Sequence, residues 1–275
     1  MCETPFMFSE FTMSAGEMTN ELRHQKRIRM EPLIFDVLKK KYSAALDAFW
    51  ETYTPPVQSD RCVLIVERRI HENLEFILKN AAYFCRGWSL CFVCSDLNLD
   101  YCRAIAGKNA DNIHYIVAFR GNPDRDTGRR EHTLLLKNAD FYAGMPWKHL
   151  IFTQEDAYFR RPVPERLVEA YDFAASPAFW DTSMMVGGIS YRNRDAMVRV
   201  CREFQEDIFW EDCFFDKGTK ALGLRRPAFE EALDYFGESC FSEDPIAVHQ
   251  WWTYFYLDME DADYFFRNLL RLEIV

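Results

Sequence analysis

The segment CVLIVERR, residues 62–69, joins an apolar run of strand length to three charged residues. A run that is apolar on both faces predicts a strand buried within a parallel sheet. Apolar residues at three- and four-residue spacing over residues 74–82 then predict a helix, which Asn73 can cap. The stretch SLCFVC at residues 89–94 repeats the strand pattern. Strand, helix and strand in this order are typical of an α/β sheet.

The same alternation continues along the chain. Residues 101–106 predict a short helix, and residues 114–119 and 149–153 predict two further strands. In sheets of this kind, ligands bind at the carboxyl ends of the strands. Residues that follow these strands are therefore the first candidates for a functional site.

The N-terminal sixty residues differ in character from the rest. Residues 1–30 are polar and lack a sustained apolar period, so we expect a loosely ordered lead. This lead ends in a basic cluster: Arg23, His24, Lys26, Arg27 and Arg29. Residues 33–49 have the spacing of an amphipathic helix that Pro55 and Pro56 end. We expect this lead and helix over residues 1–60, and one catalytic-sized domain over residues 61–275.

Composition excludes several classes of protein. The 275 residues carry 33 Lys and Arg against 43 Asp and Glu, a net charge of -10, which argues against binding to nucleic acid. No apolar run is long enough to span a membrane, and the N-terminus lacks the pattern of a signal peptide. Nine scattered cysteines suit reduced thiols better than a disulfide framework. We therefore expect a cytoplasmic protein without a membrane span.

Two segments in the second half of the chain combine carboxylates with strand-like or aromatic neighbours. In TQEDA, residues 153–157, carboxylates follow a buried strand and can hold Mg²⁺ or Mn²⁺, or simply begin a turn. In FWEDCFF, residues 209–215, Glu211 and Asp212 lie among apolar residues, where one of them can act as a general base with a raised pKa. The start of a helix would give the same acidic pattern.

Two further segments suggest contact with a ligand. In MMVGGIS, residues 184–190, the pair Gly187 and Gly188 allows a close approach of the backbone to a ligand, or forms a tight turn. In PIAVHQWW, residues 245–252, His249 is a candidate metal ligand or diphosphate donor, or a structural histidine. The indoles of that segment are candidates for stacking on a sugar or a base.

The segment RGNPDRDTGRR, residues 120–130, is rich in turn-forming residues and carries charges of both signs. It is interpreted either as a solvated, mobile loop or as a lid that clamps phosphate through its arginines.

Taken in order, these segments resemble a glycosyltransferase-like family catalogued mainly as a domain of unknown function. More distantly they resemble the β-1,4-galactosyltransferases, and both groups are of the GT-A type. The resemblance covers about residues 62–252. It rests on residues 63–69, 71, 73–76, 78–80, 150–156, 171–173, 187–192, 211–215 and 247–249. It implies a single GT-A-like (Rossmann-like) domain whose mixed central sheet is flanked by helices, with an N-terminal helical extension.

The resemblance also implies roles for individual residues. Asp156 and His249 correspond to ligands of a divalent metal, Mn²⁺ or Mg²⁺. Glu211 and Asp212 correspond to the acidic pair that contacts the acceptor, and Asp212 is favoured as the base. Residues near the donor nucleotide sugar are Glu67, Arg68, Arg69, Gln154, Glu155, Gly187 and Gly188. Candidates for stacking on the acceptor or on sugar rings are Trp210, Trp251 and Trp252.

One position departs from the family pattern. Gln154 stands where many GT-A enzymes carry the first aspartate of their metal motif, so this metal site has fewer charged ligands. The expected function is transfer of a sugar from a nucleotide diphosphate donor, a UDP-sugar, to an acceptor hydroxyl with inversion. Two alternatives stay open: a catalytically inactive sugar-nucleotide-binding protein with a regulatory or scaffolding role, and a nucleotidyltransferase.

Overall fold

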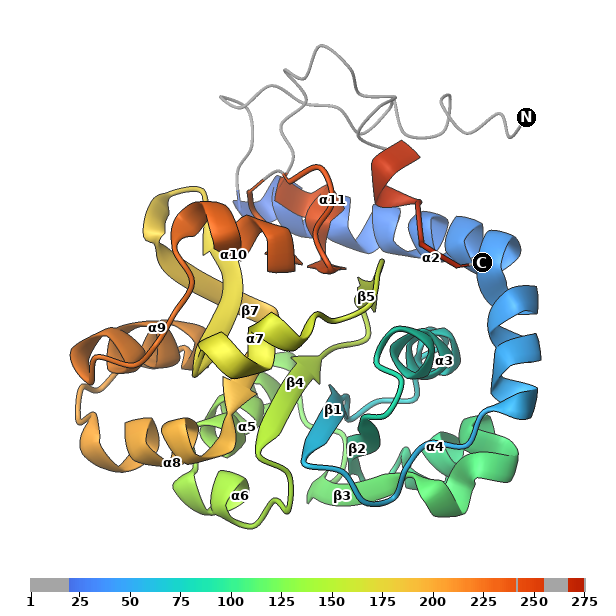
Figure 1. The fold of residues 1–275 in the computed structure, drawn as a ribbon, viewed down its shortest axis with the longest axis horizontal. Helices are drawn as coiled ribbons and strands as arrows, with labels where there is room; N and C mark the ends of the chain where they lie inside the picture. Colours follow the sequence, from blue (N-terminus) through green and yellow to red (C-terminus); the bar gives the residue numbers. More distant parts are fainter. Residues whose placement is uncertain (1–19, 241, 255–266, 275) are drawn as a thin grey trace.

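A six-stranded mixed sheet forms the centre of the protein in a computed structural model that describes residues 20–240, 242–254 and 267–274 (Figure 1). The strand order is β3-β2-β1-β4-β7-β6, and the first four strands are parallel. Strand β7 pairs with β4 and with β6 in antiparallel fashion. The bounds are β1 Arg61–Val66, β2 Ser89–Ser95, β3 His114–Phe119, β4 His149–Thr153, β6 Phe173–Ala178 and β7 Asp181–Asn193. The four predicted strands and the mixed sheet are thus confirmed.

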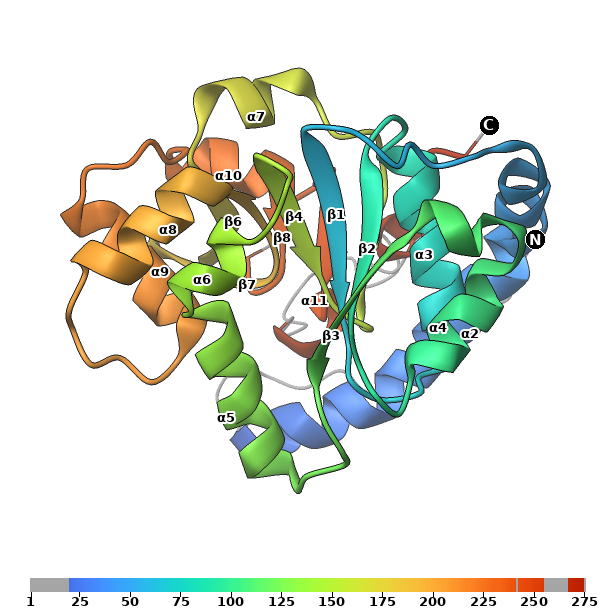
Figure 2. The same ribbon diagram turned by 90° about the horizontal axis from the view of Figure 1, so that it is seen from below.

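Helices cover both faces of this sheet (Figure 2). One face is covered by α3 (Leu74–Phe84) and α4 (Leu99–Ala106), and a 3-10 turn, η3 (Gly107–Asn112), follows α4. The other face is covered by α5 (Arg125–Leu136), α6 (Ala139–Ala143), α8 (Arg194–Glu203) and α9 (Glu211–Ala221). Within β1, Val63 and Ile65 join the core on the α3 side, whereas Leu64 and Val66 join the core on the α8 side. This alternation is why the strand is apolar throughout.

Asn73 precedes α3 as predicted, but it does not cap the helix with its side chain. Its amide instead donates hydrogen bonds to Glu31 Oε1 and to the carbonyl oxygen of Glu155, each at 3.3 Å. Asn73 therefore ties α3 to the end of β4 and to the N-terminal helix.

A small three-stranded sheet lies beside the main one, with the order β5-β9-β8. Its strands are β5 (Ala157–Phe159), β8 (Phe236–Gly237) and β9 (Ala247–His249), and β9 is antiparallel to β5. Three further helices of the described residues are α7 (Glu165–Ala170), α10 (Phe229–Tyr235) and α11 (Trp251–Tyr254). Because β5 begins just after β4, this sheet brings β9 to the end of β4.

The N-terminal helix, α2, extends from Asn20 to Thr52 and passes through Pro32. This corrects the expected loose lead for residues 20–30, while residues 1–19 lie outside the described residues. Every fourth residue from Met30 to Trp50 is buried in the same core as α3 and β1. This packing stabilises the helix despite the proline. Helix α2 is thus part of the domain's core. Among the described helices, none has the length and apolar character needed to cross a membrane.

The connectivity places a crevice between β1 and β4. From β1 the chain moves outward to β2 and β3, and then returns to place β4 on the other side of β1. The connections from these two neighbouring strands leave in opposite directions, which opens a space beyond their carboxyl ends. The topology therefore locates the expected binding site at Val66 and Thr153.

Candidate functional site

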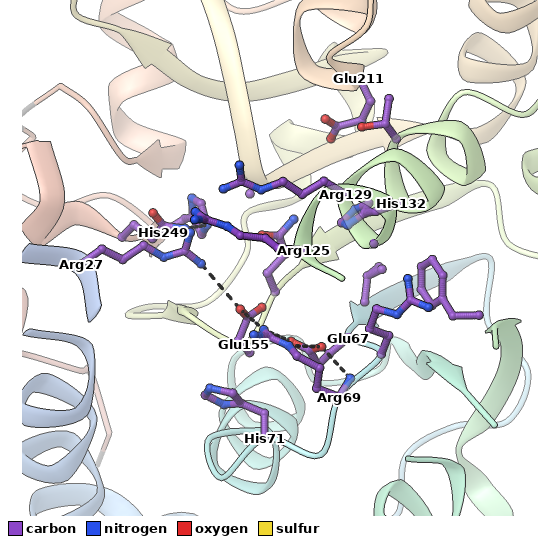
Figure 3. A pocket seen from close by; sticks show the side chains of 18 of the residues that line it. Arg27, Glu67, Arg69, His71, Arg125, Arg129, His132, Glu155, Glu211 and His249 are labelled. Atoms are coloured by element: carbon purple, nitrogen blue, oxygen red, sulfur yellow. Dashed lines mark hydrogen bonds and ion pairs between the residues drawn. The ribbon is translucent and has the colours of Figure 1, made fainter. Parts of the chain in front are cut away.

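A cavity of about 760 Å³ lies at this switch point (Figure 3). Its volume is within the range of small-molecule binding sites. The walls come from the ends of β1 and β4, from α2 and α5, from the glycine pair in β7, from the start of α9 and from the end of β9. Segments from the whole length of the described chain thus meet at one place.

Most of the residues singled out in the sequence line this cavity. They are Glu67, Arg68, Arg69, Gln154, Glu155, Gly187, Gly188, Trp210, Glu211, Asp212 and His249. Asp156 is fully buried beside His249. The structure therefore brings the predicted donor, acceptor and metal residues together, and their individual roles stay predictions.

Trp251 and Trp252 are the exceptions, and the prediction that they stack on sugar rings is wrong. Both indoles are fully buried. Trp251 Nε1 donates to the carbonyl oxygen of Cys240, and Trp252 meets the ring of Phe35 edge-on at a centroid distance of 6.2 Å. Helix α11 packs against α2, so both indoles face the core instead of the cavity.

The different burial of two tryptophans predicts a large effect on stability for one substitution and a small effect for the other. Replacing the buried Trp252 with alanine is expected to lower the free energy of unfolding by about 3–5 kcal/mol, as for other large buried aromatics. Replacing Trp210, which is 48% exposed, is expected to change it by less than about 0.5 kcal/mol. Urea denaturation of the two variants checks this prediction, and equal losses would contradict it.

At the end of β1, Arg69 is bound between two carboxylates. Its Nη2 lies 2.6 Å from Glu67 Oε2 and 2.6 Å from Glu155 Oε1. Burial raises the pKa of Glu155, and the charges of Asp156 and Glu67 raise it further. Arg68 is also paired, since its Nη1 lies 2.7 Å from Glu131 Oε2. The two arginines that the sequence predicted near the donor are thus already neutralised.

Asp156 and His249, the predicted metal ligands, lie side by side but bind each other. Asp156 Oδ1 is 3.0 Å from His249 Nε2, and Asp156 Oδ2 accepts hydrogen bonds of 2.7 Å from Arg27 and from Gln250. His249 Nδ1 is 3.0 Å from Glu238 Oε2. No three His, Cys, Asp or Glu side chains of the described residues are grouped to hold a metal ion. In this arrangement the two residues do not fit a divalent ion, because other side chains already contact both oxygens of Asp156 and both ring nitrogens of His249.

The charges around His249 favour its protonated form. Burial by itself would lower the pKa of His249, but the charges of Glu238 and Asp156 outweigh it and raise the pKa to about 10. Burial likewise opposes ionisation of Asp156, but His249 and Arg27 hold its pKa below the usual value. An imidazolium has no lone pair for a metal, so these shifts agree with a closed cluster of ion pairs.

The glycine pair lies within β7, at an irregularity in its pairing with β6. The register shifts there: Ala175 pairs with Ser190, whereas Ser176 pairs with Val186. Neither Gly187 nor Gly188 has a positive φ, so the pair is not the tight turn of the alternative interpretation. A Cβ on Gly188 would overlap the ring of His249. A glycine is therefore required at position 188, because the ring of His249 packs directly against its Cα.

Glu211 and Asp212 begin α9 and also face the cavity. Glu211 Oε1 is 3.3 Å from the Nη2 of the buried Arg192, whereas Asp212 Oδ1 accepts a 2.7 Å hydrogen bond from the backbone N–H of Cys213. Burial, and then the charge of Glu211, raises the pKa of Asp212 to about 7. The two interpretations of this segment, a helix start and a candidate base, are thus compatible.

Two helix faces line the cavity in places where the sequence predicted no helix, although the basic cluster of residues 23–29 and the arginines of residues 120–130 had been singled out. Helix α2 contributes His24, Arg27, Ile28 and Glu31, and α5 contributes Arg125, Gly128, Arg129 and His132. Both sets follow the spacing i, i+3, i+4, i+7 of one helical face. This spacing is visible in the sequence and could have predicted the two faces. The expected loop at residues 120–130 becomes helical at Arg125, because Asp124 caps α5 by accepting from the backbone N–H groups of Asp126 and Thr127.

Comparison with known proteins gives a family model that matches part of the chain and a distantly similar solved structure. A family model described as "Protein of unknown function (DUF5672)" matches residues 122–249, which include α5, β4, β7 and the start of α9. A search of curated proteins gives no match. Among solved structures, mouse xyloside xylosyltransferase 1 in its apo form has 10% sequence identity and a TM-score of 0.43, covering 78% of this chain and 94% of that chain. The family match agrees with the resemblance to a domain of unknown function, whereas the more distant resemblance to β-1,4-galactosyltransferases stays a prediction.

Proposed function

We propose that this chain is a glycosyltransferase that binds a nucleotide diphosphate sugar, with UDP as the expected nucleotide, in the cavity beyond β1 and β4. One observation carries the proposal. Asp212, whose pKa is raised to about 7 by burial and by the charge of Glu211, faces the same cavity of about 760 Å³ as several arginines and a buried acidic strand end. A proton acceptor opposite cationic groups is what the transfer of a sugar from a diphosphate requires.

The proposed reaction is a single displacement. Asp212 accepts the proton of an acceptor hydroxyl while the hydroxyl oxygen attacks the anomeric carbon of the donor. The bond between that carbon and the diphosphate oxygen breaks, and its electron pair leaves with the nucleoside diphosphate. Attack from the face opposite the leaving group inverts the anomeric carbon.

Two further residues have supporting roles in this proposal. The carboxylate of Glu211 lies 3.3 Å from the guanidinium of Arg192, and its charge raises the pKa of Asp212. Trp210 exposes its indole beside Phe209, with ring centroids 4.8 Å apart, and also lines the cavity. An exposed ring at this position suits stacking on the acceptor.

The raised pKa of Asp212 predicts a pH dependence. The base must be ionised to accept a proton, so activity is expected to increase as the pH rises through about 7 and then to level off. Below this pH, the turnover number should fall about tenfold per pH unit. A profile of kcat from pH 5 to 9 measures it. A kcat that stays constant between pH 5 and 7 would contradict Asp212 as the base.

A product assay tests the proposed function against its two alternatives. The protein is incubated with a panel of nucleotide sugars and acceptor glycosides, and the released phosphates are separated by chromatography. Release of nucleoside diphosphate together with a glycosylated acceptor supports the proposal. Release of pyrophosphate would indicate a nucleotidyltransferase, and thermal stabilisation by nucleotide sugars without any turnover would indicate a binding protein.

A further inference from the structure

The five arginines that line the cavity fall into two groups. Arg68 and Arg69 are neutralised by Glu131, Glu67 and Glu155 at the β1 end. The other three lie on the two helices opposite: Arg27 on α2, and Arg125 and Arg129 on α5. These three cations have no role in the proton transfer described above.

The second group converges on one part of the cavity. Figure 3 shows Arg125 and Arg129 extending from α5 toward Arg27 and His249. Arg125 contacts α2 directly, with Nη1 3.2 Å from His24 Nε2. Arg27 Nη2 lies 2.7 Å from Asp156 Oδ2. The side chains of α2 and α5 thus form a cationic wall next to the end of β4.

Nearby carboxylates compensate the positive charges of this wall only in part. Arg27 lies 2.7 Å from Asp156 and 3.6 Å from Glu155, but Asp156 also contacts His249, and Glu155 also contacts Arg69. Within the described part of the chain, neither Arg125 nor Arg129 has a carboxylate within ion-pair distance. Burial, and then the charges of Arg125 and Arg27, lowers the pKa values of His24 and Arg129. An anion placed here would relieve this repulsion between like charges.

We propose that Arg125 and Arg129, together with Arg27, bind the diphosphate of the donor and offset the charge of the leaving nucleoside diphosphate without a divalent ion. This inference rests on the proposed function. Guanidinium groups match phosphate oxygens with paired hydrogen bonds and stay charged at every relevant pH. As the bond to the anomeric carbon breaks, its electron pair remains on the β-phosphate oxygen, and the N–H groups of the arginines donate to that oxygen.

The alternative source of positive charge is a metal ion at Asp156 and His249. There, both carboxylate oxygens of Asp156 and both ring nitrogens of His249 already face other side chains. A metal would have to displace Arg27 and Gln250 from Asp156, or Glu238 from His249. The cationic wall needs no such rearrangement.

Pyrophosphate binding tests the inference without reference to the base or sugar of the donor. The full chain, treated with EDTA, is titrated with pyrophosphate and with UDP by calorimetry. The double variant Arg125→Gln/Arg129→Gln is expected to bind both anions about 10- to 100-fold more weakly per arginine removed. The matched control is Arg130→Gln, an exposed residue on the same helix that does not line the cavity, and it should bind like the wild type.

The results separate this inference from the proposed function. The inference is supported if the wild type binds UDP equally well in EDTA and with Mn²⁺ or Mg²⁺, and if only the double variant loses affinity. UDP binding that requires Mn²⁺ or Mg²⁺ and is unaffected by the double substitution would overturn it while leaving the proposed function intact. If neither UDP nor UDP-sugars bind the wild type with or without metal, the proposed function fails, and the inference fails with it. Thermal unfolding of each variant verifies that it is folded.

Discussion

Replacing Asp212 with asparagine should lower the rate of sugar transfer by about 10²- to 10⁴-fold, the usual contribution of a general base. Asparagine keeps the size of the side chain but cannot accept the proton of the acceptor hydroxyl. Donor binding should stay nearly unchanged, because Asp212 acts on the acceptor. Single-turnover kinetics and calorimetry with the donor measure the two quantities separately.

The stability of this variant provides a second readout. Because the pKa of Asp212 is raised above its usual value of 3.8, its ionisation destabilises the folded state as the pH rises toward 7. Asparagine removes this cost, so the variant should unfold at the same temperature as the wild type, or at a higher one, at pH 8. Asp207→Asn, an exposed residue that does not line the cavity, is the matched control. Transfer at the wild-type rate by the Asp212 variant would exclude this residue as the base.

Replacing Gly188 with alanine should cost about 3–5 kcal/mol of stability and abolish donor binding. The new methyl group would overlap the ring of His249. That ring is buried and lies between Asp156 and Glu238, so moving it leaves buried charges without partners. Urea denaturation measures the loss of stability, and calorimetry with UDP measures the loss of binding.

The adjacent glycine provides a matched control. A Cβ on Gly187 would lie 3.4 Å from the Cβ of Ser190, an ordinary distance. Gly187→Ala should therefore keep its stability within about 1 kcal/mol of the wild type. If both alanine variants were equally stable, the close packing of Gly188 on His249 would not be an important part of the site.

The sequence was sufficient to predict the central strands because their burial is visible in their composition. Residues 62–66 and 89–94 are apolar on both faces, since β1 and β2 lie between two helical layers. The location of the site followed from the same strands, because charged residues come directly after β1 and β4. Glu67 and Glu155 indeed line the cavity.

The helical walls were harder to predict, because they contribute charge instead of apolar surface. Helix α5 buries little more than Thr133 and Leu136, so its sequence lacks the apolar period of a packed helix. The first turns of α2 likewise present His24 and Arg27 to the cavity. Apolar spacing indicates burial in a core, whereas most of the residues that α2 and α5 turn toward the cavity are polar or charged.

Partners from distant segments could not be predicted from the sequence either. The proximity of Asp156 and His249 was expected from the resemblance, but their contacts with Arg27 and Glu238 depend on how α2 and β8 pack. Trp252 was misassigned for a related reason. An indole suits both a core and a sugar-binding platform, and only the packing of α11 against α2 decides between them.

A structure of the protein with bound UDP, prepared without added metal, tests the proposed diphosphate site and the proposed base together. We expect a diphosphate beyond the ends of β1 and β4, with Arg125 and Arg129 within about 2.7–3.2 Å of its oxygens. The carboxylate of Asp212 should face the open space next to the β-phosphate, where the sugar would lie. A nucleotide bound outside this cavity, or a diphosphate on the far side of the site from Asp212, would contradict this expectation.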